Sequence, residues 1–234
     1  MEHWFYHPHL PGVGHVFTFD EVESRHLGRS LRKSAGDAID VTDGRGLLVR
    51  ARIEDVGKRA VEARVEAVLR QEDQRPHPYT LCVAPTKNIA RFETLLEKAT
   101  EIGIGAVVPI YTRHSERRRL KEDRCRAILV SAMKQSRSLW CPVWHAPCHL
   151  DDWLEDDRAA GDRFIAWLGE GTTPLVDRAP GPATVLIGPE GGFHPDEVAA
   201  ARSVGYRPVH LGGSRLRTET AGIVAVVLLH SWHG

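Results

Sequence analysis

Several features that mark common protein classes are missing from this sequence of 234 residues. Its formal net charge is +0, so no overall field attracts nucleic acid, and any nucleic-acid site must be a local basic surface. The longest apolar run, Ile223 to Leu229, is too short to cross a bilayer, and the N-terminal MEHWFYHPHL lacks the basic region and apolar core of a signal peptide. We therefore expect a soluble, cytoplasmic protein with no membrane partner.

Cysteine is also scarce and scattered. The four cysteines form no CxxC pair, which is typical of reduced thiols rather than of a disulfide framework. Cys141, His145, Cys148 and His149 are close in sequence and include possible metal ligands, but their spacing matches no standard zinc module and two prolines interrupt it. We expect a rigid connector here and no metal site.

Residues 1–72 have the pattern of a small, mostly antiparallel β-barrel. Apolar and polar residues alternate on both sides of an Asp43-Gly44 turn, which is a hairpin signal. Asp20 and Glu23 predict the N-cap and the capping-box acid of a short helix. The strands that we expect in this part cover residues 16–19, 38–42, 47–53 and 60–69.

Residues 73–234 change to alternating strands and helices, after a polar, proline-rich linker at 71–78. Apolar residues at helical spacing predict a helix that Gly103 ends, and a long charged helix is expected over 117–139. This alternation implies an α/β domain with a parallel sheet and a ligand site at the carboxyl ends of its strands. The expected strands cover residues 79–84, 106–110, 163–168, 184–187 and 208–211.

A glycine loop, Gly188-Pro-Glu-Gly-Gly192, follows one of these strands. It matches neither a GK[ST] nor a GxGxxG pattern, and it presents Glu190 where a phosphate site needs a cation. The next helix starts with the acidic stretch Pro195-Asp-Glu197, which would repel a polyphosphate. The loop therefore favours a ligand that is neutral or cationic at the contact, such as S-adenosylmethionine. A tight turn before a capped helix is the alternative interpretation of this loop alone.

A second glycine loop, Gly212-Gly-Ser-Arg-Leu-Arg217, follows the last predicted strand. It runs into the apolar segment 221–229, which predicts a helix buried on nearly every side. Arg217 and Glu219 precede that segment, where charges are costly unless they pair or meet a ligand. They either form a structural pair at a core helix or belong to a binding site. Two such loops after neighbouring strands predict a crevice.

Taken together, the two loops resemble one methyltransferase family. GPEGGF at 188–193 followed by LGGSRLRTETA at 211–221 is similar to the SPOUT superfamily, specifically to the enzymes that methylate nitrogen-3 of a uridine in 16S ribosomal RNA of the small subunit. The similarity extends to Thr86-Lys87, to 96–103 and to 26–32, and so covers essentially the whole chain. It implies a PUA-like RNA-binding β-barrel domain, then a SPOUT α/β methyltransferase domain with a trefoil knot, in a homodimer.

The resemblance also implies site residues. Arg217 would stabilise the deprotonated uridine by its charge, with Glu190 or Glu219 as orienting groups or proton acceptors. His194 stands where a Ser or Thr helix cap is usual, which predicts a weaker cap, and Lys134 stands where many members have an acid, which argues against a catalytic role there. The cofactor-binding positions implied for S-adenosylmethionine are Leu168, Gly169, Gly188, Glu190, Gly191, Gly192, Leu211, Gly212, Ser214, Leu216, Arg217 and Thr218.

A neutral protein needs local basic surfaces to bind RNA. Basic residues gather in two segments, residues 25–33 and 113–137. A charge run is also typical of a solvated helix face, and that interpretation stays open. The expected partner is 16S ribosomal RNA within the small ribosomal subunit. The candidate RNA contacts are Arg29, Arg32, Lys33, Arg117, Arg118, Arg119 and Arg137.

Three other functions stay in view. A nucleotide-binding transferase or hydrolase could use the glycine loops for phosphate, but the missing lysine and the acids argue against it. A non-catalytic RNA-binding factor of ribosome assembly is the second, although a pure binding module has no need of two intact loops. The third is a SPOUT methyltransferase that acts on another RNA.

Overall fold

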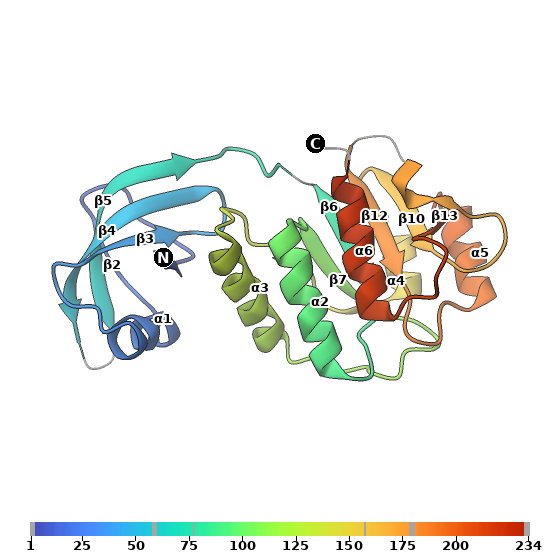
Figure 1. Ribbon diagram of the computed structural model, residues 1–234, viewed down its shortest axis with the longest axis horizontal. Coiled ribbons are helices and arrows are strands. Elements are labelled where there is room, and N and C mark those ends of the chain that lie inside the picture. The colour runs from blue at the N-terminus through green and yellow to red at the C-terminus, as the bar shows by residue number, and fades with distance from the viewer. Residues whose placement is uncertain (1–2, 58–59, 77, 157, 178–180, 232–234) are drawn as a thin grey trace. The chain divides into compact units, whose positions relative to one another are not determined.

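The computed structural model describes residues 3–57, 60–76, 78–156, 158–177 and 181–231, and it divides into two compact units (Figure 1). The first unit contains Met1–Arg75 and Val130–Cys141, and the second contains Pro76–Leu129 and Pro142–Gly234. The chain therefore returns to the first unit after it has left it. A single boundary between residues 72 and 73 does not describe this return.

The first unit is built on a five-stranded sheet with the strand order β1-β3-β4-β5-β2. All neighbouring strands are antiparallel except β1 and β3, which are parallel. Alternate residues of β5 are buried along its first half, as expected of a strand with one face on a core. The strands are β1 (Trp4–Tyr6), β2 (Val16–Thr18), β3 (Ala38–Thr42), β4 (Leu47–Val56) and β5 (Val61–Gln71).

A short helix, α1 (Glu21–Arg25), continues into a π-helical turn, His26–Ser30. Asp20 is its N-cap as predicted, because the Asp20 carboxylate accepts a hydrogen bond of 2.8 Å from the Glu23 N–H. The Glu23 carboxylate, predicted to complete a capping box, instead pairs with the Lys134 ammonium, and both side chains are largely buried. Lys134 therefore has a structural partner in this unit.

The segment after α3 (Glu122–Ser136) extends the first unit. The Gly46 N–H donates to the Leu139 carbonyl at 3.0 Å, and the Cys141 N–H donates to the Gly44 carbonyl at 2.9 Å. The Trp140 indole N–H donates to the Glu72 carboxylate at 3.0 Å. A side chain at Gly46 would meet the Glu72 carbonyl at 2.2 Å, so the close approach of these segments requires glycine there.

The second unit is an eight-stranded sheet whose described pairs are all parallel, as predicted. Its order is β11-β13-β10-β12-β6-β7-β8, with β9 paired to β7. The carboxyl ends of β10, β12 and β13 consequently lie side by side. The strands are β6 (Tyr79–Val83), β7 (Ala106–Tyr111), β8 (Val143–Trp144), β9 (Cys148–His149), β10 (Asp162–Ala166), β11 (Thr173–Pro174), β12 (Ala183–Ile187) and β13 (Arg207–His210).

Helices cover this sheet in two pairs. α2 (Ile89–Ile102) and α6 (Thr218–His230) pack side by side, and Gly222 lets them approach, since a side chain there would meet Leu95 at 2.7 Å (Figure 1). α4 (Leu150–Glu155) and α5 (Pro195–Ser203) share a core with one face of the sheet. A 3-10 turn, η2, covers Leu175–Asp177.

Three helix predictions need correction. The charged helix begins at Glu122 and not at residue 117, because 112–120 form a loop that contacts neighbouring loops. α6 begins at Thr218 and is not buried on every side, since Val227 is 48% exposed. His194 forms the N-cap of α5 after all: its Nδ1 accepts from the Asp196 N–H at 3.2 Å, and its own N–H donates to Glu197 at 2.7 Å.

Within the described part of the chain, no helix has the length and apolar character needed to span a membrane.

Candidate functional site

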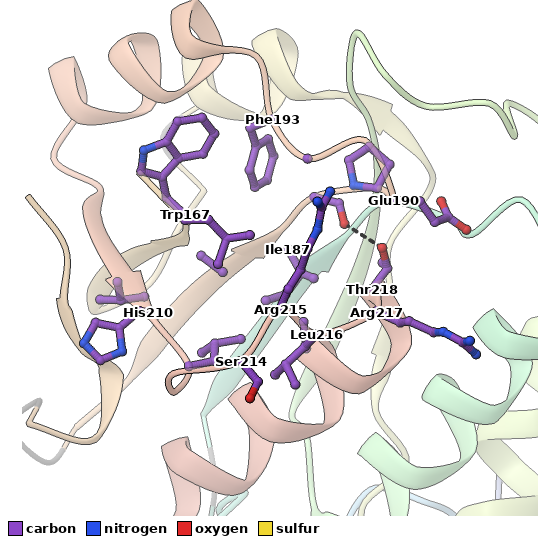
Figure 2. A pocket seen from close by; sticks show the side chains of 18 of the residues that line it. Trp167, Ile187, Glu190, Phe193, His210, Ser214, Arg215, Leu216, Arg217 and Thr218 are labelled. Carbon is purple, nitrogen blue, oxygen red and sulfur yellow. Dashed lines mark hydrogen bonds between the residues drawn. The ribbon is translucent and has the colours of Figure 1, made fainter. Parts of the chain in front are cut away.

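A pocket of about 450 Å³ lies where β10, β12 and β13 end, as the crevice rule for parallel sheets predicts (Figure 2). Its volume falls within the range of ordinary small-molecule sites. Its lining residues all belong to the second unit and come from the ends of these strands, the loops that follow them and the start of α6. The lining residues are Ala166, Trp167, Leu168, Ile187, Gly188, Pro189, Glu190, Gly191, Gly192, Phe193, Val209, His210, Leu211, Gly212, Ser214, Arg215, Leu216, Arg217, Thr218 and Ala221.

One side of the pocket is apolar. Trp167, Ile187, Phe193 and Leu216 stand around it, as Figure 2 shows. Phe193 is buried, and its ring lies so close to Gly188 that a side chain at Gly188 would meet it at 3.1 Å. Glycine at 188 therefore leaves room for the Phe193 ring. Such a wall suits a flat, weakly polar ring system better than a chain of phosphates.

The first glycine loop, residues 188–192, is fixed by the protein itself. Its turn is closed by a hydrogen bond of 2.8 Å from the Gly192 N–H to the Pro189 carbonyl, and Gly192 has a φ of 71°, which favours glycine. The His114 Nδ1–H donates to the Gly192 carbonyl at 3.0 Å. The Glu190 carboxylate accepts from the Lys87 N–H at 3.0 Å. This loop is thus tied to the loops that follow β6 and β7.

The second glycine loop, residues 211–217, has few internal ties. Among the described residues, the backbone N–H groups of 212–217 donate to no protein acceptor. Arg217 is the N-cap residue of α6 without a side-chain hydrogen bond, so the first turn of this helix also leaves its N–H groups free. The Thr218 hydroxyl donates to the Gly188 carbonyl at 3.1 Å and joins the two loops (Figure 2). This wall offers backbone donors to a ligand.

The predicted cofactor residues lie around this pocket, with one exception. Gly169 does not line it, although its neighbour Leu168 does. A side chain at Gly169 would meet the Trp167 indole at 2.0 Å, so glycine there leaves room for Trp167. Trp167, Ile187, Phe193 and His210 line the pocket and were not predicted; each lies next to a predicted residue or within a few positions of one, which was the available signal.

The three residues expected to act in catalysis separate into two groups. Glu190 and Arg217 line the pocket, and Figure 2 shows both directed to the same side, away from Trp167 and Phe193. Glu219 does not line it. The Glu219 carboxylate instead faces Arg91 of α2 at 3.7 Å, and its Oε2 atom is buried with no hydrogen-bond partner among the described residues.

The loop after β7 adds polar groups beside the first glycine loop. The Arg113 guanidinium donates to the Asp196 carboxylate at 2.8 Å, and this hydrogen bond lowers the pKa of Asp196. The Arg113 side chain also lies 3.1 Å from His194 Nδ1. Because Arg113 can only donate, His194 Nδ1 accepts there and its proton sits on Nε2. The buried Glu197 accepts from the Arg113 N–H at 2.8 Å, which anchors this loop to the start of α5.

The candidate RNA contacts fall in both units. Arg29, Arg32, Lys33 and Arg137 belong to the first, and Arg32 and Arg137 have left-handed backbone conformations, with φ of 52° and 56°. Arg29 also lines a shallow hollow of about 770 Å³ in that unit. In the second unit, Arg118 and Arg119 are exposed, whereas Arg117 is half-buried and its guanidinium donates to backbone carbonyls.

Among the described residues, no group of three or more His, Cys, Asp or Glu side chains could hold a metal ion.

Comparison with known proteins gives the class. The profile of the RNA methyltransferase domain family matches residues 73–230, and that of the RNA methyltransferase PUA domain matches residues 19–66. The chain therefore belongs to the RNA methyltransferase family. The predicted fold class, an α/β methyltransferase domain preceded by a PUA-like domain, is confirmed.

Relatives narrow the class further. Ribosomal RNA small subunit methyltransferase E of Mycobacterium bovis is 33% identical over 97% of this chain and 92% of its own. A probable rRNA-methyltransferase from Porphyromonas gingivalis has a similar structure (TM-score 0.87, 38% identity, 98% and 97% of the two chains). So does a ribosomal RNA small subunit methyltransferase E from Neisseria gonorrhoeae, solved bound to S-adenosyl methionine (TM-score 0.89, 26% identity, 99% and 98%). The particular family is thus that of the small subunit methyltransferases E.

Proposed function

We propose that this protein transfers a methyl group from S-adenosylmethionine to nitrogen-3 of a uridine in 16S ribosomal RNA of the small subunit. The observation that carries the proposal is the pocket at the ends of β10, β12 and β13, with its apolar wall and its free backbone donors. The relative from Neisseria gonorrhoeae, which is similar over 99% of this chain, binds S-adenosyl methionine. The choice of uridine nitrogen-3 rests on the resemblance of the two glycine loops.

The residues present fit this cofactor. The apolar wall of Trp167, Ile187 and Phe193 suits an adenine ring, and the N–H groups of 212–217 can serve its ring nitrogens or the ribose oxygens. Arg215 and Arg217 also line the pocket, but the first glycine loop presents Glu190, which would repel phosphate while tolerating a sulfonium. The cofactor, when bound, supplies an electrophilic methyl group. The predicted cofactor residues, Gly169 included, are proposed to hold it.

The residues of this chain contribute mainly by position and charge. Methyl transfer would form a bond between the methyl carbon and nitrogen-3, break the bond from that carbon to the sulfonium sulfur, which leaves as a neutral thioether, and release the nitrogen-3 proton. The reacting base must therefore be held in line and its negative charge stabilised. We assign that charge stabilisation to Arg217, whose side chain lies on the pocket rim with Glu190. Glu190 would orient the base or accept its proton. Glu219 faces Arg91, which leaves it an orienting role through that arginine.

RNA binding is assigned to basic residues of each unit, all of them exposed except the half-buried Lys33. Arg29, Arg32, Lys33 and Arg137 are candidates in the first unit, and Arg118 and Arg119 in the second. Each phosphate contact would contribute electrostatically and make affinity fall with salt. The expected substrate is RNA within the small ribosomal subunit, and the expected location is the cytoplasm, where that subunit is assembled.

Two further features of the resemblance are proposed for the second unit. After β13 the chain returns to α6, which contacts α2, β6 and β12, as a segment passed through a trefoil knot would do. α6 also leaves an apolar side open, with Val227 48% exposed and Ile223, Val224 and Leu228 half-buried. We propose that a second copy of the chain covers this face in a homodimer. Sedimentation at several concentrations would test it, with Val227→Glu expected to yield monomers.

The deciding experiment is a methyl-transfer assay with labelled S-adenosylmethionine. Undermethylated ribosomal RNA would be offered naked and as assembled small subunits, and the modified nucleoside identified after digestion. Label in 3-methyluridine supports the proposal, and label in another nucleoside would move the enzyme to another target. Tight cofactor binding without label in either form of ribosomal RNA would favour another RNA target, and failure to bind the cofactor at all would favour a non-catalytic binding factor. Stronger binding of ATP than of S-adenosylmethionine would favour a phosphate-using enzyme.

A further inference from the structure

The Lys87 peptide is held from both sides in the loop that joins β6 to α2. Its N–H donates to the Glu190 carboxylate at 3.0 Å, and its carbonyl accepts from the Arg117 Nη2 at 2.7 Å. The preceding carbonyl, that of Thr86, accepts from the Arg117 Nε at 3.0 Å. Arg117 and Glu190 thus grip the same short piece of backbone, one from the loop after β7 and one from the first glycine loop.

Arg117 differs in this from the arginines next to it. Its side chain is half-buried and makes a two-pronged contact with two carbonyl groups. Arg118 and Arg119 are exposed, and within the described part of the chain they make no hydrogen bond or ion pair. In the basic run of residues 117–119, one side chain is therefore bonded within the protein and two are available to a partner.

The loop that contains Thr86 and Lys87 is connected to both sides of the pocket, the first glycine loop and the start of α6. Through Glu190 it reaches the first glycine loop. In the other direction, the Asn88 side chain caps α2 by accepting from the Ala90 N–H at 3.1 Å, and α2 packs on α6 at Leu95 and Gly222. α6 begins with Thr218, whose hydroxyl returns to the Gly188 carbonyl. These contacts form a closed path that includes the first glycine loop and the start of α6.

We propose that Arg117 is a positioning residue for the cofactor pocket and not an RNA contact. It fixes Thr86 and Lys87, and through Glu190 it fixes the shape of the first glycine loop. The inference rests on the proposed function, since it takes S-adenosylmethionine as the ligand of that pocket. It replaces the assignment of Arg117 to RNA that the basic run alone suggested.

Arginine and lysine distinguish the two roles. A phosphate contact needs a positive charge, which lysine supplies nearly as well. A two-pronged contact with adjacent carbonyls needs the planar fork of a guanidinium, which lysine lacks. Arg117→Lys therefore keeps what RNA would require and removes what positioning requires. Arg118→Lys and Arg118→Ala are the matched controls, because Arg118 is the exposed neighbour in the same run.

The test measures cofactor affinity by calorimetry and RNA affinity at several salt concentrations, with the thermal midpoint of each variant recorded. Arg117→Lys should raise the Kd for S-adenosylmethionine about tenfold, with unchanged RNA affinity and salt slope, and kcat should recover at saturating cofactor. Arg118→Ala should leave the cofactor Kd as in the unmodified protein and reduce the salt slope by about one. If Arg117→Lys does not fold, Arg117→Gln, which keeps one donor, takes its place with the same expectation.

Coupling to Glu190 supplies a second readout. Because both side chains act on one peptide, Arg117→Lys combined with Glu190→Ala should bind the cofactor no more weakly than the weaker single variant. Additive losses would overturn the proposal, and so would an unchanged cofactor Kd in Arg117→Lys. If the unmodified protein does not bind S-adenosylmethionine at all, the proposed function fails. That outcome is distinct from failure of the role of Arg117.

Discussion

The two glycine loops that wall the pocket are held in different ways. The first, residues 188–192, is tied by Glu190 to Lys87, by the Gly192 carbonyl to His114, and by its own turn. The second, residues 211–217, leaves the N–H groups of 212–217 without protein acceptors in the described part of the chain. One loop is therefore a preformed template, and the other is a set of donors that a ligand has to satisfy.

Because of this difference, the first loop should contribute mainly to the stability of the fold and the second mainly to ligand affinity. Contacts of the first loop contribute to the stability of the protein whether or not a ligand is present. Backbone donors of the second loop gain partners other than water only when a ligand binds, so they contribute to affinity. Substitutions in the two loops should accordingly change different measurements.

The largest expected effect is on stability and concerns Phe193, the residue that follows the first loop. Phe193 is 3% exposed and packs in the core under α4 and α5, so Phe193→Ala should lower the free energy of unfolding by about 3–5 kcal/mol. The matched change in the second loop is Leu216→Ala, at a half-buried side chain, which should cost less than about 1 kcal/mol. Urea unfolding of both variants measures this. Equal losses would mean that the second loop is also part of the core.

The next effect concerns Glu197, which anchors the loop after β7 to the start of α5. The buried Glu197 carboxylate accepts from the N–H groups of Arg113 and His194, at 2.8 and 2.7 Å. Glu197→Ala should lower the free energy of unfolding by about 2–3 kcal/mol, because two backbone N–H groups lose a charged acceptor. Glu197→Gln keeps an acceptor and should lose less. Urea unfolding of the two variants tests this order of stability. If the glutamine variant lost as much unfolding free energy as the alanine variant, the negative charge of Glu197, and not its capacity to accept hydrogen bonds, would be what stabilises the loop.

The hydrogen bond between the first glycine loop and the start of α6 gives a smaller effect, and on affinity rather than stability. Thr218→Val removes the hydroxyl that donates to the Gly188 carbonyl and keeps the shape of the side chain. We expect the Kd for S-adenosylmethionine to rise about tenfold, equivalent to about 1.4 kcal/mol, since the second loop loses its link to the template. Thr218→Ser, which retains the hydroxyl, is the control. A normal Kd in the valine variant would mean that the loops act independently.

The parts of this site that local sequence pattern predicted are those that depend on neighbours in the chain. Strand and helix periods predicted the parallel sheet, and the glycines predicted two loops at strand ends. The Asp20 cap was likewise readable from its own segment. These features need only the residues beside them, so a single sequence contains them.

What the pattern did not predict depends on residues far apart in the chain. Glu190 and Lys87 are separated by 103 positions, and Arg117 and Thr86 by 31. Nothing in the basic run distinguishes Arg117 from Arg118, because the difference arises only from the loop that folds against it. The pairing of Glu219 with Arg91 was hidden for the same reason.

The smallest expected effect lies at the periphery of the first loop and depends on pH. The Arg113 guanidinium lowers the pKa of the Asp196 carboxyl, so the stabilisation from this pair is present above the ordinary pKa of aspartate, about 3.9, and is lost as pH falls through the lower folded value. Because both groups are exposed, the effect is small and screened by salt. Asp196→Asn should unfold at a slightly lower temperature than the unmodified protein at neutral pH, with the difference vanishing in strong acid and in high salt. A difference that persisted in acid would show that the aspartate acts through hydrogen bonding at the start of α5, which would make even the edge of this loop part of the preformed template.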